Sequence, residues 1–137
     1  MTDPLDQLLT EIRADPAVAA LTSRVRGGEP APGDAAVPFE RFVVLVRLGT
    51  QRDKRAPVQV VRLGLRCYGA TFVDAAALYG TVSDAIHNVG PRIGATGVLI
   101  YRSFDDIGNG ATKDPDTGQP VESGVISLFA ATQVVAA

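Results

Sequence analysis

Two long apolar-rich segments joined by a short charged stretch constrain the fold of this 137-residue chain more than any other feature. The first, Phe39 to Leu48, contains a run of five consecutive β-forming apolar residues, which is typical of a strand buried on both faces. In the second, Val58 to Tyr68, apolar and polar residues alternate, as in a strand with one face in the core. The polar residues 49–57 between them therefore predict a hairpin with a charged tip.

The N-terminal part of the chain carries two signals for the start of a helix. Asp3-Pro4 places a capping carboxylate before a proline at the first helical position, and apolar residues then recur at helical spacing through Ile12. We expect this helix to end near Ala14, because Pro16 disfavours helical geometry at the residue before it. Asp15-Pro16 repeats the signal and predicts a short helix through about Leu21.

A longer helix is predicted directly after the hairpin. Thr71 and Asp74 resemble a capping box, and Gly90-Pro91 ends the helical pattern. Glycine inside a helix costs about 1 kcal/mol relative to alanine, so we interpret Gly80 as a close packing contact. The buried stripe of this helix is expected to consist of Phe72, Ala76, Tyr79, Val82, Ile86 and Val89.

The C-terminal part predicts two more strands and a long loop. Gly97 to Phe104 is a strand pattern with Val98, Ile100, Arg102 and Phe104 on one face, and Val125 to Val135 is the last strand. Residues 105–123 between them are expected to form a loop, which at this length is usually functional. The predicted fold class is α+β: a mostly antiparallel sheet of about four strands with two main helices packed on it, a long hairpin and a long loop.

Composition indicates one ordinary globular domain. The chain has 46% hydrophobic and 20% charged residues, and its length suits a single core over residues 1–137. The net charge of −2 is divided unevenly: residues 1–40, 41–102 and 103–137 carry −4, +6 and −4. Such a chain could pair head to tail with copies of itself. No secretion signal and no membrane-spanning apolar run is recognised, so we expect a cytoplasmic origin.

Few residues suggest chemistry. His87 is the only histidine and lacks an evident partner, so a surface helix position is the simpler interpretation. Cys67 alternates with core residues in its strand and is expected to be a small buried hydrophobe. Asp114, Asp116 and Gly118 resemble a calcium loop only superficially, because glycine stands at the third ligand position. We therefore predict no catalytic, metal-binding or cofactor-binding residues.

Basic residues are concentrated on the predicted strands and at the hairpin tip. Arg52, Lys54 and Arg55 crowd the tip and could contact nucleic-acid phosphates. The acidic total, the aspartate inside the tip and the absence of a stacking aromatic cluster favour contacts with protein instead.

The order of these motifs resembles the tail terminator family of long-tailed bacteriophages, also described as tail completion or head-to-tail joining proteins. Together with the first helix the motifs span nearly the whole chain. They are Val37-Pro38-Phe39 before Val43-Val44-Leu45-Val46, Val58-Gln59-Val60 to Tyr68-Gly69-Ala70-Thr71 with Asp74-Ala75-Ala76 and Leu78 in the next helix, and Asp114-Pro115-Asp116-Thr117-Gly118 before the last strand.

The resemblance implies a single tail-terminator-like domain whose copies close into a homo-oligomeric ring, commonly a hexamer. Such a ring caps the tail tube and joins it to the head-tail connector, and DNA only passes through its channel. The implied location is the virion tail or neck, after assembly in the cytoplasm of a host bacterium and without membrane contact. Family members are not enzymes and need no cofactor.

The resemblance also implies that the charged loops are the docking elements. The residues predicted to lie at the interface are Arg52, Lys54, Arg55, Asp105, Asp106, Asp114 and Asp116.

Other readings remain open at this point. The chain could be another neck adaptor, such as a head completion protein, or a tail tube subunit. A small enzyme using His87 or the Asp114–Asp116 loop, and a nucleic-acid-binding domain, are alternatives of different classes.

Overall fold

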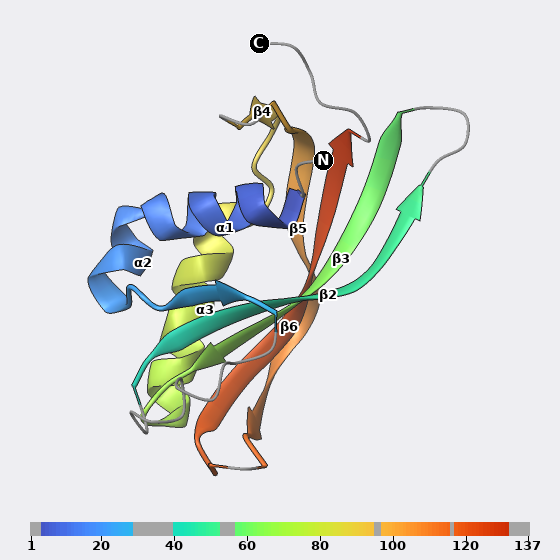
Figure 1. Cartoon of the computed structure of the whole chain (residues 1–137). Coiled ribbons are helices and arrows are strands. Elements are labelled where there is room, and N and C mark those ends of the chain that lie inside the picture. The colour runs from blue at the N-terminus through green and yellow to red at the C-terminus, as the bar shows by residue number, and fades with distance from the viewer. Residues whose placement is uncertain (1–3, 29–39, 53–56, 95–96, 116, 132–137) are drawn as a thin grey trace.

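A six-stranded sheet dominates the protein (Figure 1). The computed structural model describes residues 4–28, 40–52, 57–94, 97–115 and 117–131. The strand order is β1-β2-β3-β6-β5-β4, and among these described strands only β1 and β2 pair in parallel. The strands are β1 (Val25–Gly27), β2 (Phe42–Arg52), β3 (Val58–Tyr68), β4 (Arg92–Ile93), β5 (Leu99–Lys113) and β6 (Pro120–Ala131).

The predicted hairpin is formed by β2 and β3, which pair antiparallel from Phe42 opposite Tyr68 to Arg52 opposite Gln59. The alternation predicted for β3 is confirmed: Val61, Leu63, Leu65 and Cys67 are fully buried in the core. A register shift between Arg47 and Gly49 places one extra residue, Leu48, in β2, where it is 58% exposed. The tip, residues 53–56, lies outside the described residues.

The prediction of a long loop over residues 105–123 is wrong, because most of this segment lies in a second long hairpin. Strand β5 continues to Lys113, and β6 begins at Pro120. The turn between them is short, and the Asp114 backbone N–H donates to the Gln119 carbonyl at 2.9 Å. The residues of β5 after Phe104 have weak strand propensity, so it is their pairing with β6 that holds them extended.

A β-bulge in β5 changes which of its residues share a face. Ile100 pairs with Ala130 and Arg102 with Phe129, so Tyr101 is an extra residue that shifts the alternation by one. Ile100 therefore points into the core, whereas Arg102 and Phe104 lie on the opposite face from Ile100. The expectation that these residues share one face is wrong for this reason.

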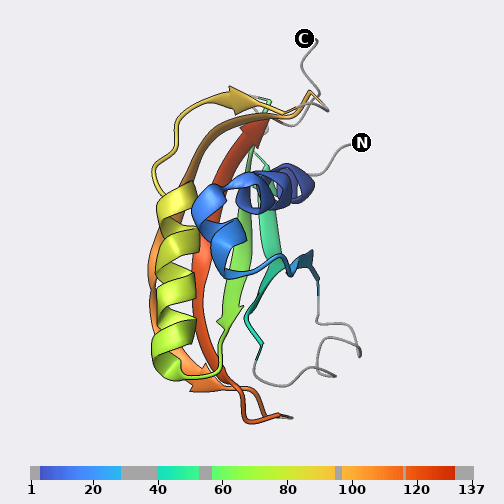
Figure 2. The same ribbon diagram turned by 90° about the vertical axis from the view of Figure 1, so that its left-hand side faces the viewer.

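Three helices lie on one side of the sheet (Figure 1). They are α1 (Pro4–Ala14), α2 (Pro16–Leu21) and α3 (Phe72–Ile86). Asp15 caps α2 as predicted, accepting from the backbone N–H groups of Ala17 at 2.9 Å and Val18 at 3.1 Å. Figure 2 shows α3 running along the sheet with α1 lying crosswise to it.

Helix α3 begins as predicted, but its buried stripe is different. Thr71 caps it by accepting from the Asp74 N–H at 3.1 Å. The helix ends at Ile86, and Phe72, which was expected to be buried, is 41% exposed. Ala76 is also exposed, and the residues that α3 buries are Ala75, Leu78, Tyr79, Val82 and Ile86. Gly80 is exposed and no atom lies within 4 Å of the position of a Cβ there, so the inferred close contact at Gly80 is absent.

These observations overturn the predicted fold class. Strands form 49% of the residues that the structure describes, and six strands curl into a half-barrel where a sheet of about four was predicted (Figure 2). The helices are small and cover one face, so they do not form the predicted layer of two main helices. The sequence pattern of residues 24–26 is consistent with a short strand, and β1 lies there, whereas sequence patterns missed the extra length of the β5–β6 hairpin and the short edge strand β4.

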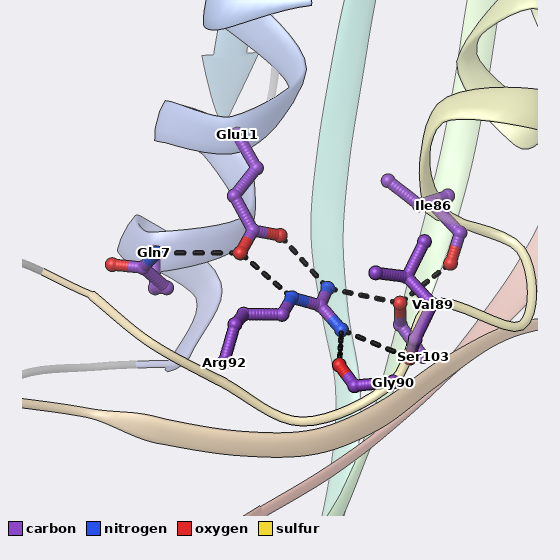
Figure 3. A network of polar contacts seen from close by, with 7 residues as sticks. All are labelled: Gln7, Glu11, Ile86, Val89, Gly90, Arg92 and Ser103. Atoms are coloured by element: carbon purple, nitrogen blue, oxygen red, sulfur yellow. Dashed lines mark hydrogen bonds and ion pairs between the residues drawn. The ribbon is translucent and has the colours of Figure 1, made fainter.

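An ion pair fastens α1 to the far edge of the sheet (Figure 3). The Arg92 guanidinium donates to both carboxylate oxygens of Glu11, each at 2.8 Å. The same guanidinium donates to the carbonyls of Val89 and Gly90, each at 3.1 Å, and to the Ser103 hydroxyl at 3.0 Å. One side chain therefore holds together α1, the segment after α3, and β5.

Candidate assembly surface

The face of the sheet away from the helices is the candidate functional surface, and we call it the open face. Partners across an antiparallel pair share a face, so the register defines which side chains point there. The open face includes Val58, Val60, Arg62, Gly64 and Arg66 of β3, Ser123, Val125, Ser127 and Phe129 of β6, and Arg102, Phe104 and Asp106 of β5. No helix of the described part of the chain packs on this face (Figure 1).

One end of the open face is closed by a small apolar cluster. Phe42 and Tyr68 stack with ring centroids 4.0 Å apart and an interplanar angle of 8°. Val44 and Val121 complete the buried cluster, and Val46 packs against it. The Arg24 guanidinium lies 5.0 Å from the centre of the Phe42 ring. This end of the face is thus already packed within the monomer.

The other end carries an apolar hollow, which we call the aromatic groove. Val58, Tyr101, Arg102, Phe104 and Phe129 line a hollow of about 390 Å³. The rings of Phe104 and Phe129 meet edge to face, with centroids 5.8 Å apart. Both phenylalanines are only half-buried, and a second hollow that reaches Val60 and Arg62 shares them. A partner that filled the groove would remove this aromatic surface from water.

Two arginines border the aromatic groove. Arg102 lines the groove itself, and Arg62 lines the adjoining hollow together with Asp106. Arg66 also lies on the open face, but opposite Val44 at the end that the apolar cluster closes. Asp106 accepts a hydrogen bond from the Ser127 hydroxyl at 2.5 Å. Arg102 is exposed, lies 5.8 Å from the centre of the Phe104 ring and donates to the Asn88 amide oxygen at 2.9 Å. The described part of this face therefore offers an apolar centre with a basic rim.

The structure separates the residues predicted to form the interface. Arg52 is exposed at the end of β2, whereas Lys54, Arg55 and Asp116 lie outside the described residues. Asp114 is half-buried and organises the β5–β6 turn: its carboxylate accepts from the Thr117 N–H at 3.2 Å, and its carbonyl accepts from the Gly118 N–H at 2.8 Å.

Adjacent Asp105 and Asp106 point in opposite directions. Asp106 lies on the open face, but Asp105 faces α3, where it accepts from the Tyr79 hydroxyl at 2.9 Å and the Ser83 hydroxyl at 2.8 Å. Burial, followed by this hydrogen bond and the charge of Asp105, raises the pKa of Tyr79. Asp105 therefore ties α3 to β5 within the monomer.

His87 and Cys67, the two residues considered for chemistry, both make contacts that belong to the fold. His87 is an exposed residue that caps the C-terminus of α3, and its Nδ1 accepts from the Asp105 N–H at 3.0 Å. Cys67 is fully buried, as predicted, and this burial together with the charge of Glu122 raises the pKa of its thiol. Among the described residues, no three His, Cys, Asp or Glu side chains gather as metal ligands would.

Sequence reasoning missed the aromatic groove. Phe104 was placed on the same face as Ile100, and Phe129 was not singled out. The bulge at Tyr101 determines which face of the sheet Phe104 occupies. No residue pattern in β5 predicts this bulge.

Comparison with known proteins shows a likeness in fold. No protein-family model matches the chain, and no curated protein matches it. Among solved structures, the fold is similar to a chain from the virion of a native gene transfer agent particle, with a TM-score of 0.64 and 21% sequence identity. The similarity covers 90% of this chain and 91% of that chain. At this identity the likeness establishes a shared fold.

Proposed function

We propose that this protein is a structural protein of a virion. The observation that carries the proposal is the fold likeness to a virion chain over nearly the full length of both molecules. The open face supports it, because half-buried phenylalanines within a basic rim suit contact with another protein. None of the helices in the described ranges has the length and apolar content needed to cross a membrane.

Within this class, we propose the role of tail terminator. Residues 1–137 would form a single tail-terminator-like domain, and copies would close into a homo-oligomeric ring, most simply a hexamer. The ring would end the tail tube and join it to the head-tail connector, with DNA only passing through. The likeness of motif order to tail terminators supports this role, and the full-length fold match supports the wider class of virion structural protein. The protein would act in the tail or neck of the particle after assembly in the host cytoplasm, as a non-enzyme without a cofactor.

A ring of this kind is a heterologous assembly, in which each copy presents two different surfaces. The apolar groove on the open face would supply free energy at about 25 cal/mol per Å² of apolar surface buried. The basic rim would contribute to steering and register more than to affinity.

Light scattering and electron microscopy of the purified protein test the proposal. We expect closed rings, either from the protein alone or when tail tubes from the same particle are added. Long filaments of the protein alone would indicate a tube subunit, and binding to the connector but not to the tube would indicate a head completion adaptor. A monomer at every concentration that also fails to bind either structure would contradict a virion role.

A further inference from the structure

The sheet has two long strand edges that are only partly covered. On the outer side of β2, β1 pairs with Val43 to Leu45 and no further. On the outer side of β5, β4 pairs with Leu99 and Ile100, and a single bridge joins Val89 to Ser103. Within the described parts of the chain, residues 48–52 of β2 and 106–113 of β5 thus have no partner strand on their outer side. We call them the β2 edge and the β5 edge.

Hydrogen-bonding groups on both edges point outward. The Leu45 carbonyl points away from β3, since it accepts from Gly28. Leu45 pairs with Leu65, and Thr50 pairs with Val61 four residues along β3. Pairs separated by four residues have the same hydrogen-bonding pattern in an antiparallel ladder, so the N–H and C=O of Thr50 also point away from β3.

The same reasoning applies to β5. The Asp105 N–H points outward, because it donates to His87. Asp105 pairs with Ile126 and Ala111 pairs with Glu122, again four residues apart on the shared partner strand. The backbone groups of Ala111 therefore point away from β6.

The directions of the two edges fit each other. Strands β2, β3, β6 and β5 alternate in direction across the sheet, so β2 and β5 run antiparallel. A second copy in the same orientation can therefore place its β5 edge beside the β2 edge and continue the antiparallel order. Because the two surfaces differ, this contact repeats from copy to copy and can close a ring.

We propose that successive copies of this chain join by antiparallel strand pairing between the β2 edge of one copy and the β5 edge of the next. The inference rests on the proposed function, for which it specifies the contact between subunits. An unpaired edge invites such a strand, and the pairing satisfies backbone groups that water otherwise solvates. The short strands β1 and β4 leave different halves of the two edges open, so neighbouring copies are offset along the strand direction, as in a barrel with tilted strands.

Proline substitutions on each edge test the proposal. Thr50→Pro and Ala111→Pro each remove one outward N–H without removing a bond of the monomer's own ladder. Thr50→Val and Ala111→Ser are the matched controls, because they keep the N–H. Light scattering should show that both proline variants remain monomeric where the wild type and both controls form rings, with far-UV circular dichroism confirming that each variant is folded.

Mixing the two proline variants gives a sharper result. The Ala111→Pro copy keeps an intact β2 edge and the Thr50→Pro copy keeps an intact β5 edge, so the mixture should give a heterodimer that does not grow. Rings from both proline variants would overturn the inference and leave the proposed function standing. A wild type that stays monomeric and binds neither tube nor connector would overturn both.

Hydrogen–deuterium exchange of the wild type tests the proposed strand pairing even if a proline variant does not fold. Amides of the β2 and β5 edges should exchange at least tenfold more slowly in the ring than in the monomer. Unchanged exchange at both edges in an assembled ring would overturn the inference.

Discussion

Glu11 of α1 and Arg92 of β4 form a two-bond ion pair across 81 positions of sequence, with both N···O distances at 2.8 Å (Figure 3). Both side chains are mostly shielded, being 25% and 18% exposed, so this pair is less screened by solvent than a surface pair. Because Arg92 also donates to Val89, Gly90 and Ser103, it organises the whole region where the N-terminal helix meets the sheet edge.

A double-mutant cycle on this pair should show coupling. We expect Glu11→Ala and Arg92→Ala to interact by roughly 1–2 kcal/mol in the free energy of unfolding, measured by urea denaturation. Arg92→Lys should recover little of it, because lysine keeps the charge but cannot make the two parallel bonds. Additive single-mutant effects would show that the pair contributes nothing of its own.

Two glycine-to-alanine substitutions should act in opposite directions. Gly80 is exposed in α3 with open space at the Cβ position, so Gly80→Ala should raise the free energy of unfolding by up to about 1 kcal/mol. At Gly124 a Cβ would overlap the Tyr79 hydroxyl, so Gly124→Ala should lower it. Thermal unfolding of both variants checks the pair, and a destabilised Gly80→Ala variant would contradict the open environment seen here.

Stability should fall at alkaline pH because of two buried groups. Burial is the main cause that raises the pKa values of Cys67 and Tyr79 above their ordinary values of about 8.5 and 10. In the unfolded chain these groups ionise first, so the stabilisation is complete below those ordinary values and is lost as pH rises above them. Each group contributes a slope of up to about 1.4 kcal/mol per pH unit. Tyr79→Phe and Cys67→Ala should each flatten the decline of unfolding free energy between about pH 9 and 11.

The aromatic groove predicts an assembly defect without a folding defect. Phe129→Ser removes a half-buried ring from the open face, so it should weaken ring formation or tube binding at least tenfold. Phe72→Ser is the matched control, since Phe72 is 41% exposed at the start of α3 on the helical side of the sheet. Sedimentation measures the assembled fraction of each variant. Equal assembly by the two variants would show that the groove is not part of the interface.

The basic hairpin tip can be tested as a set. Replacing Arg52, Lys54 and Arg55 by alanine should leave the melting temperature nearly unchanged and slow assembly, because charges at the margin of an interface act mainly on encounter rates. The effect should shrink as salt rises from 50 to about 500 mM, where screening is short-ranged. Assembly rates indifferent to both the substitutions and the salt would exclude the tip from the contact.

Local signals in the sequence predicted the local parts of the fold. The alternation of β3, the proline and capping signals of α2 and the Thr71 cap of α3 each depend on residues only a few positions apart, and all three are found. The full length of β5 was missed because two aspartates, two glycines and an asparagine, which favour turns, stand among residues 105–110. Only pairing with β6 keeps that segment extended, and such a partner is not visible in the segment itself.

The candidate site was harder to predict for the same reason. The face of a strand residue depends on every extra residue before it, so the bulge at Tyr101 was enough to misplace Phe104. Asp105 and Asp106 looked equivalent in sequence, yet one binds α3 and the other lies on the open face. Charge composition indicated a segregation of basic and acidic segments, but not which side chains the monomer already uses.

Helices α1, α2 and α3 of the described residues lie on the same side of the sheet, and the main core lies between them and the strands. The groove end of the open face therefore contributes little to holding a single molecule together. Substitutions at that surface can change the binding partner while the fold stays intact. Binding specificity and folding can therefore evolve almost independently in this architecture.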